Sequence, residues 1–232
     1  MTRKYNYIRK PLNSILRPKL SMFYLSSKLL LSRRYFSDLN TWKKGNIGLF
    51  RNPEHFINID ADLKKSLDLF LNYIGPKDLV LDLGCNVGRV MNYLLKNKIN
   101  NIHGVDVMES TNDLRPEIFP ELSKSPLVKF FTMPFNNFFR MPNLAYYDCI
   151  ITVGATIELI HPSEKIIKKM CKITKKFIFC YINEENHQYP KLYIYEFYKE
   201  GFKLVYLERI HTEDGLYKNS ILIFKNLVDE CI

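Results

Sequence analysis

The five cysteines of this 232-residue sequence include no C-x-x-C pair, and their number is odd. A disulfide-stapled domain or a structural zinc site normally needs paired or regularly spaced cysteines, so the sequence indicates neither. The histidines also lack the spacing of metal ligands, and we expect no metal site. The thiols are therefore expected to be reduced and buried, in a reducing compartment of which the cytoplasm is the simplest example.

Acidic residues are missing from the first 37 positions, which hold nine of the 34 Lys and Arg residues. The remainder of the chain has 25 basic and 24 acidic residues, so the formal charge of +10 belongs almost entirely to this N-terminal segment. Proteins that act on nucleic acids usually carry their basic patch on the folded domain. The charge distribution thus favours a small-molecule partner and leaves nucleic acid as the alternative.

The basic segment also lacks an apolar run long enough to span a bilayer, and three interpretations of it remain open. Leu20–Phe36 mixes large apolar residues with cations, which predicts contact with an anionic membrane surface. The abundance of Arg, Lys and Ser is also typical of a mitochondrial transit peptide, with cleavage near Arg34–Ser37 and a location in the matrix. The third interpretation is a helix packed on the domain. We divide the chain into a basic N-terminal helical extension and connector, residues 1–59, and one domain, residues 60–232.

From residue 61 onward, the spacing of apolar residues predicts alternating helices and strands. Helical spacing begins at Ala61 and stops before Gly75 and Pro76. The seven predicted strands are Leu79–Leu83, Ile102–Asp106, Val128–Thr132, Cys149–Val153, Phe177–Ile182, Leu204–Arg209 and Ser220–Phe224. The predicted helices between them are Val87–Asn97, a proline-interrupted stretch near Asp113–Leu122, Pro162–Thr174 and Leu192–Glu200.

Strands separated by helices form βαβ units, which predicts a parallel sheet covered on both faces. The last two strands have no helix between them, and Asp214-Gly215 in their connection is a turn signal for an antiparallel pair. We therefore predict an α/β fold. It is a Rossmann-like, doubly wound, mainly parallel seven-stranded sheet with an antiparallel last strand.

A buried strand, a turn with two glycines and the start of a helix follow one another between Leu79 and Arg89, where the sequence reads LVLDLGCNVGR. Glycine tolerates positive φ and lets a ligand lie against bare backbone. A dinucleotide-binding turn has the spacing G-x-G-x-x-G and presents a helix N-terminus to a pyrophosphate. Here Asp82 precedes the first glycine and would repel a phosphate. The turn therefore favours a ligand with a cationic amino group, such as S-adenosylmethionine (SAM).

This stretch resembles the first motif of the class I SAM-dependent methyltransferases, and the resemblance extends from about Asp60 to Asn226. A parallel sheet that finishes in one reversed strand is similar to the fold of that family. The resemblance implies SAM as the cofactor. Asp82 resembles the acid that receives the methionine ammonium, and Asp106 resembles the acid that holds both ribose hydroxyls. The alternatives are a plain strand-to-helix turn and, for Asp106, a cap of the helix that starts near Thr111.

Many members of the family carry an acid after the third strand that reads the adenine amino group, whereas this chain has Thr-Met-Pro-Phe at positions 132–135. Backbone groups there, or Asn136, are the expected replacements, and Met133 and Phe135 are alternatively core residues. The residues expected to bind the cofactor are Asp82, Gly84, Cys85, Asn86, Gly88, Asp106, Val107, Met133, Pro134 and Gly154.

Polar residues that follow the fourth and fifth strands occupy the region where the resemblance places the methyl acceptor. His161 is preferred as general base because imidazoles ionise near neutral pH, and Glu158, three residues earlier, would share its helical face. Asn183 and Glu184 are expected to hydrogen-bond a polar acceptor. The structural alternatives are that His161 caps the helix from Pro162, that Glu158 is only a structural partner, and that the loop after the fifth strand is solvated.

The resemblance implies a methyltransferase that acts on oxygen or nitrogen. The Asn-Pro-Pro-Tyr signature of amino-methylating DNA and protein enzymes is absent, and the domain is nearly neutral. Both observations favour a small polar acceptor, such as a sugar, another hydroxylated metabolite or a carrier-linked intermediate. Two alternatives remain. One is an RNA- or protein-modifying enzyme that holds its substrate with the basic segment, and the other is a SAM-binding module without catalysis.

Overall fold

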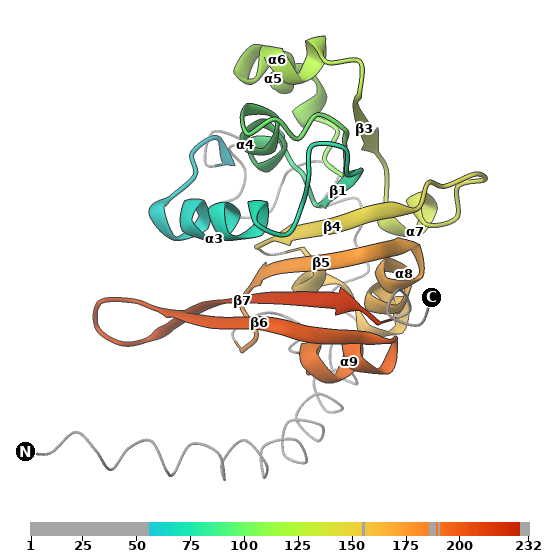
Figure 1. Ribbon diagram of the computed structural model, residues 1–232. Coiled ribbons are helices and arrows are strands. Elements are labelled where there is room, and N and C mark those ends of the chain that lie inside the picture. Colours follow the sequence, from blue (N-terminus) through green and yellow to red (C-terminus); the bar gives the residue numbers. More distant parts are fainter. Residues whose placement is uncertain (1–55, 155, 186–188, 190, 228–232) are drawn as a thin grey trace, which may run out of the picture. The chain divides into compact units, whose positions relative to one another are not determined.

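The computed structural model describes residues 56–227 except 155, 186–188 and 190 (Figure 1). These residues form a seven-stranded sheet in the order β3-β2-β1-β4-β5-β7-β6. Its strands are β1 (Val80–Leu83), β2 (Ile102–Asp106), β3 (Val128–Thr132), β4 (Tyr147–Val153), β5 (Thr174–Ile182), β6 (Phe202–His211) and β7 (Tyr217–Asn226). The basic N-terminal segment, and with it the choice between its three interpretations, lies outside the described residues.

The direction of the strands confirms the predicted topology. Strands β1 to β5 pair with one another in parallel, and β7 runs antiparallel to both β5 and β6. The β6–β7 hairpin turns at Gly215, whose φ of 81° lies in the left-handed region that glycine adopts without strain. The sheet is thus mainly parallel with one reversed strand, as the alternation of apolar segments and the Asp-Gly turn predicted.

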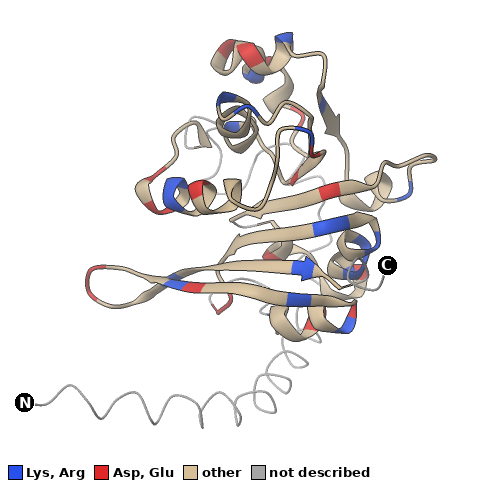
Figure 2. Ribbon diagram, viewed as in Figure 1, with Lys and Arg blue, Asp and Glu red and all other residues tan. Residues whose placement is uncertain are grey.

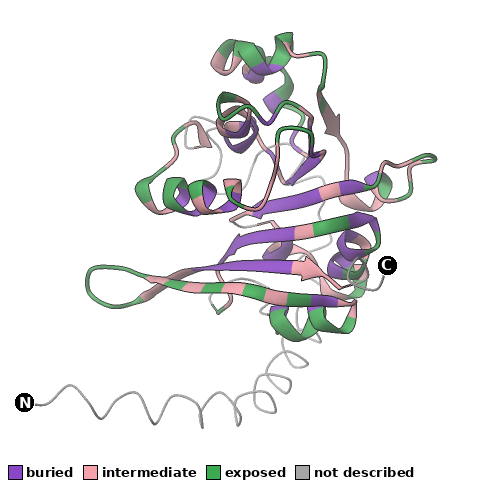
Figure 3. Cartoon of the chain, in the orientation of Figure 1, coloured by how far each residue is buried: buried purple, intermediate pink, exposed green. Residues whose placement is uncertain are grey.

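Two hydrophobic cores cover the two faces of the sheet, because neighbouring residues of a strand point to opposite faces. In β1, Leu81 and Leu83 belong to one core and Val80 to the other. Helices α3 (Ala61–Leu71), α4 (Arg89–Lys96) and α6 (Pro120–Lys124) contribute to the Val80 core. Helices α7 (Phe135–Phe138), α8 (Ile166–Ile173) and α9 (Tyr193–Lys199) contribute to the other core. Figure 3 shows the central strands as mostly buried and the edge strand β6 as mostly half-buried or exposed.

Two of the predicted helices are divided into shorter elements, and α4 begins at Arg89, two residues later than predicted. The predicted helix Pro162–Thr174 is a short 3₁₀ turn, η4 (Pro162–Glu164), followed by α8, because Lys165 between them has a left-handed conformation (φ 50°). The proline-interrupted stretch consists of α5 (Thr111–Ile118) and α6, and Pro120 occupies the first position of α6. Prolines are tolerated there because the first helical amides need no intrahelical partner. Helix α7 and the 3₁₀ turn η3 (Ile157–Leu159) were not predicted.

Candidate active site

The turn between β1 and α4 has the backbone conformation that its glycines predicted. Gly84 and Gly88 have φ values of 89° and 94°. A Cβ on Gly84 would lie 2.3 Å from Thr156 Oγ1, and one on Gly88 would lie 2.8 Å from Leu122 Cδ1. Asn86 is also left-handed (φ 47°), a conformation that asparagine adopts more readily than most residues. The glycines are therefore required by the turn and by the packing of neighbouring segments against it, whatever a ligand adds.

Asp82 is buried at the carboxyl-terminal half of β1, with a relative exposure of 1%. Its Oδ2 atom has no hydrogen-bond partner among the described residues. Burial, and secondarily the negative charge of Asp106, raises the pKa of Asp82 to about 7, while Arg89 acts in the opposite direction. A buried carboxyl group without a partner is unfavourable when ionised, so a cationic ligand would stabilise it.

Asp106, the last residue of β2, holds the neighbouring turns in place. Its Oδ2 accepts a hydrogen bond from the Asn86 amide at 2.9 Å, and its Oδ1 accepts one from the Met108 amide at 2.9 Å. Burial raises the pKa of Asp106, and these backbone amides counteract part of the shift. The alternative that Asp106 caps the following helix is wrong, because Ser110 is the N-cap residue of α5. The Val107 amide also binds this carboxylate, and of its about four lone-pair sites at least one is left for a further donor.

The segment after β3 is anchored by its backbone. The Met133 amide donates to the Asp106 carbonyl at 2.9 Å, and the Met133 side chain packs against the core. Asn136 was one expected reader of adenine, but its amide nitrogen donates to Glu164 and its amide oxygen accepts from Lys169. Because both ends of this side chain are already bound by residues of η4 and α8, Asn136 does not fit that role. Backbone groups remain the predicted contacts for adenine.

The other predicted cofactor residues lie around the same turns. Cys85 is buried, and burial raises the pKa of its thiol well above the ordinary value. Val107 follows β2 and is half-buried, and Pro134 is the N-cap residue of α7. Gly154 follows β4 with φ 56°, and a Cβ placed on it would meet no atom of the described chain within 4 Å. There is therefore room beside the backbone at this strand end.

Glu158 is fully buried and binds backbone amides from two loops. Its Oε2 accepts from the Thr156 amide at 3.0 Å, and its Oε1 accepts from the Asn183 amide at 3.2 Å. The Glu158 carbonyl also accepts from the Tyr189 amide at 3.1 Å. These bonds connect the loop after β4 with the loop after β5. The structural interpretation of Glu158 therefore describes its contacts better than a role in proton transfer.

His161 adopts the capping arrangement that was its structural alternative. Its Nδ1 accepts from the Ser163 amide at 3.2 Å and lies 2.6 Å from Ser163 Oγ, so it caps η4. The expectation that His161 and Glu158 share one helical turn is wrong, because η3 ends at Leu159 and Ile160 is extended (ψ 127°). The imidazole meets the Tyr189 ring edge-on, with centroids 5.2 Å apart. Because Nδ1 accepts a hydrogen bond from the Ser163 amide, the neutral imidazole carries its proton on Nε2, so the capping arrangement leaves neither ring nitrogen ready to act as a base.

Asn183 and Glu184 are bound to β7 by their side chains. Asn183 Nδ2 donates to the Lys218 carbonyl at 2.6 Å. Glu184 Oε2 accepts from Ser220 Oγ at 2.6 Å, and the Glu184 amide donates to Tyr217 Oη at 2.9 Å. Both residues predicted to bind the methyl acceptor thus follow β5, as expected. Their side chains already have hydrogen-bond partners within the folded chain.

Three further polar residues were missed by the sequence analysis, because no motif marks them. Lys191 donates from Nζ to the carbonyls of Ile157 and Tyr189, and burial lowers its pKa to about 8. Tyr193 is buried, and its hydroxyl has no partner among the described residues. Arg115 is buried between α5 and the glycine turn. Only contacts between distant segments reveal these residues.

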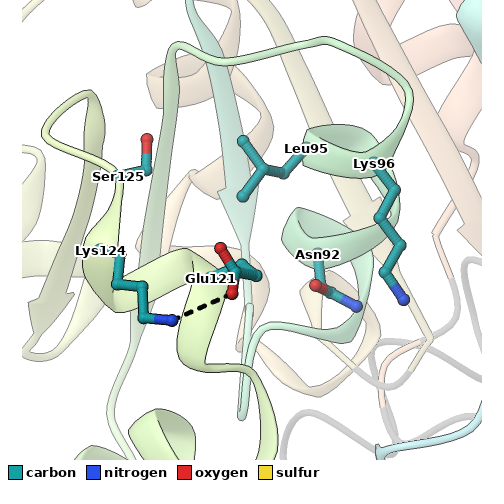
Figure 4. Close-up of a pocket in the computed structure, with 6 residues that line it drawn as sticks. All are labelled: Asn92, Leu95, Lys96, Glu121, Lys124 and Ser125. Carbon is teal, nitrogen blue, oxygen red and sulfur yellow. Dashed lines mark hydrogen bonds and ion pairs between the residues drawn. The ribbon is translucent and has the colours of Figure 1, made fainter.

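A shallow depression of about 370 Å³ lies between α4 and α6, away from the carboxyl ends of the strands (Figure 4). It is lined by Asn92, Leu95, Lys96, Glu121, Lys124 and Ser125. Its one ion pair, between Lys124 and Glu121, joins two exposed side chains. None of the polar residues described above contributes to it, so we do not assign the site to this depression.

The charges of the described domain are mixed. Figure 2 shows acidic and basic residues close together on α3. Within residues 56–227, leaving aside the five positions not described, no helix is long and apolar enough to cross a membrane. The same residues contain no group of three His, Cys, Asp or Glu side chains that could hold a metal ion.

No protein-family model and no curated protein sequence matches this chain. Its structure is similar to solved methyltransferases. Magnesium protoporphyrin IX methyltransferase from Synechocystis PCC 6803, solved with bound SAM, matches with a TM-score of 0.57 at 16% identity, over 86% of this chain and 96% of that one. A 1,6-didemethyltoxoflavin-N1-methyltransferase from Burkholderia thailandensis, solved with bound S-adenosylhomocysteine, matches with a TM-score of 0.58 at 15% identity, over 81% and 84%.

A protein from Pyrococcus horikoshii that is provisionally described as an RNA methyltransferase also matches, with a TM-score of 0.54 at 14% identity, over 87% of this chain and 95% of that one. Together with the strand order, these similarities establish that the chain has the class I methyltransferase fold. One fold supports many reactions, so identities of this size do not assign a substrate.

Proposed function

We propose that this protein is a SAM-dependent methyltransferase that transfers a methyl group to oxygen or nitrogen of a small polar metabolite, such as a sugar or a carrier-linked intermediate. The observation that supports the proposal most directly is the unpartnered Oδ2 of buried Asp82, beside the glycine turn. A ligand ammonium would provide the missing partner and the missing positive charge. Two structural neighbours of the same fold contain SAM or its demethylated product.

Charged residues at the turns after β1 and β2 support such a cofactor. Asp82 would receive the ammonium, and Arg89, at the first position of α4, would face the carboxylate of the same amino-acid group. Arg89 is close enough to Asp82 to lower its pKa, and it donates from Nη1 to the Asn58 carbonyl at 3.0 Å. Asp106 would accept from the ribose hydroxyls with its remaining lone pairs. When bound, SAM supplies an electrophilic methyl group on a sulfonium.

The chain itself must hold the acceptor in line with that methyl group, exclude water and, where needed, remove a proton from the acceptor. Open parallel sheets bind ligands beyond the carboxyl ends of their strands, which directs attention to the loops after β4 and β5. Gly154 leaves room there, and Glu158 holds the two loops together. His161 would accept the proton at Nε2 only after Nδ1 releases the Ser163 amide and itself carries a proton, which it can donate to Ser163 Oγ.

Isothermal titration calorimetry with S-adenosylhomocysteine tests the cofactor assignment. Asp82→Asn keeps the shape of the side chain and removes its charge, and we expect a loss of affinity of about 10- to 100-fold, the size of a hydrogen bond to a charged group. The matched control is Asp113→Asn on exposed α5, which should leave affinity unchanged. Wild-type protein that binds no S-adenosylhomocysteine would contradict the proposal.

Methyl transfer is tested by incubating the protein with labelled SAM and metabolite pools. A labelled small molecule supports the proposal. Binding without any product indicates a SAM-binding module instead. Once the acceptor is known, His161→Ala should reduce turnover by about 10²-fold at saturating SAM if the imidazole is the base. Unchanged turnover would remove His161 from the mechanism.

The basic N-terminal segment supports RNA as a second class of acceptor, because nine cations without an acid favour phosphate binding. Removal of residues 1–37 separates the two classes. Loss of salt-sensitive RNA binding together with loss of RNA methylation would favour RNA. Methylation of a small metabolite by the truncated protein at the full-length rate would favour the first proposal.

A further inference from the structure

We propose that Arg115 is a positioning residue that fixes the nucleoside end of the cofactor site by connecting the turns after β1, β2 and β3. This inference rests on the proposed function, because it assumes that a nucleoside lies against those turns. Arg115 is a residue of α5 and has a relative exposure of only 5%. A buried arginine is unfavourable unless its donors and its charge are satisfied, so its contacts indicate what it stabilises.

The first contacts of Arg115 reach the turns after β1 and β2. Its Nη2 donates to the Asn86 carbonyl at 3.0 Å, within the glycine turn. The same Nη2 donates to Thr111 Oγ1 at 3.1 Å, and Thr111 Oγ1 donates to the Met108 carbonyl at 2.7 Å. One guanidinium nitrogen thus connects Asn86 after β1 with Met108 after β2.

A second set of contacts reaches the end of β3. Arg115 Nη1 donates to Asn112 Oδ1 at 3.4 Å, and Thr132 Oγ1 donates to the same oxygen at 2.7 Å. The guanidinium carbon also lies 3.6 Å from the centroid of the Phe130 ring in β3, which is a cation–π contact. Planarity and a fork of donors allow arginine to make all these contacts at once, which lysine cannot do.

These contacts matter for a nucleoside because of the way Asn86 is held. Its amide donates to Asp106 and its carbonyl accepts from Arg115, so the peptide groups around Asn86 are fixed between an acid and a cation. The chain has Thr132-Met133 where an acid could read adenine, so recognition at this end depends on backbone groups in the right places. Arg115 Nε is a buried donor without a partner among the described residues, so the contacts above are made by the other two guanidinium nitrogens.

The test compares two probes by isothermal titration calorimetry, well below the unfolding temperature of each variant. S-adenosylhomocysteine has both ends of the cofactor, and 5′-methylthioadenosine has only the nucleoside end. Arg115→Met should weaken both probes by the same factor, about tenfold or more. Asp82→Asn should weaken S-adenosylhomocysteine and leave 5′-methylthioadenosine unchanged. Arg115→Lys should bind both probes nearly as weakly as Arg115→Met, because lysine keeps the positive charge but lacks the planar, forked set of N–H donors.

Arg140→Met, at an exposed arginine after α7, is the control and should bind both probes like the wild type. Folded Arg115→Met with wild-type affinity for both probes would overturn the inference. Where Arg115→Met does not fold, Asn112→Ala and Thr132→Val decide, because each removes one arm of the network near the surface. We expect each to weaken both probes by about threefold, and wild-type affinity in both variants would also overturn it. A wild-type protein that binds neither probe would instead refute the proposed function.

Discussion

Two sides of the site use their buried acids differently. On the proposed cofactor side, formed by the turns after β1, β2 and β3, Asp82 has an oxygen without a partner among the described residues. On the proposed methyl-acceptor side, formed by the described parts of the loops after β4 and β5, both oxygens of Glu158 accept hydrogen bonds from backbone amides. The difference shows that burial of a carboxylate alone does not single out a candidate binding residue. Our proposal for Asp82 rests on its unpartnered oxygen as well as on its burial.

The two sides meet where Gly84 packs against Thr156, and this contact gives the largest expected effect. Gly84→Ala places a Cβ 2.3 Å from Thr156 Oγ1 in a residue with φ 89°. Backbone strain and overpacking together should lower the free energy of unfolding by about 3 kcal/mol. Chemical denaturation measures it. Gly154→Ala is the control, with positive φ but open space, and should cost only about 1 kcal/mol.

Adding Thr156→Ala to Gly84→Ala should restore part of the lost stability, because it removes Oγ1 and Cγ2 from the path of the new Cβ. The remaining loss would come from the positive φ. If the double variant is no more stable than Gly84→Ala alone, the two sides of the site do not meet through this contact.

The second prediction sets Glu158→Gln against Asp82→Asn. Glu158→Gln replaces one of the two carboxylate oxygens by an NH₂ group, which cannot accept the hydrogen bond from a backbone amide. The variant should therefore lower the free energy of unfolding by about 2 kcal/mol. Asp82→Asn removes an unpartnered buried acid and should leave stability unchanged or raise it, while cofactor affinity falls. Thermal unfolding of both proteins without ligand measures the contrast. Equal destabilisation by the two variants would remove the distinction between the sides.

The third prediction concerns pH. The pKa of Asp82 in the ligand-free protein is raised to about 7, and only the ionised form attracts an ammonium. Affinity for S-adenosylhomocysteine should therefore fall as pH decreases below 7, by up to about tenfold per pH unit, and be flat just above it. Asp82→Asn should remove this dependence. Calorimetry between pH 5.5 and 8 in matched buffers measures it, and the same slope in the variant would assign the titration to another group.

The same shift predicts how stability changes without ligand. Because the folded pKa of Asp82 lies above its unfolded value near 3.8, the folded state binds the proton more tightly. The contribution of Asp82 to the free energy of unfolding should therefore decrease as pH rises from about 4 to about 7. The denaturant midpoint of the wild type should therefore decrease relative to that of Asp82→Asn as pH rises over this range.

The smallest expected effect is at His161. Its Nδ1 caps η4, so His161→Ala should lower the free energy of unfolding by about 0.5–1 kcal/mol, as for other lost caps. His211→Ala, at an exposed histidine at the end of β6, is the control and should have a smaller effect. A loss well above 1 kcal/mol would mean that contacts of His161 other than the cap dominate.

Much of the fold could be predicted because its signals are local. Apolar segments of strand length alternate with helical spacing, and the structure confirms all seven strands within a few residues. The left-handed conformations of Gly84, Gly88 and Gly215 could be predicted, because few other residues adopt them without strain. The division between η4 and α8 at Lys165 could not be predicted, since lysine does not favour a left-handed conformation.

By itself, the sequence determined the parallel sheet, its reversed last strand and the glycine turn that follows Asp82. Each of these features is specified by residues close together in the sequence. Only the tertiary structure decided which polar groups already have partners. Asn86 and Arg115 are 29 residues apart, and Glu158 and Asn183 are 25 apart, and no local pattern pairs them. Such pairs form only when strand ends come together and exclude water, which is also what leaves Asp82 unpartnered and shifts its pKa.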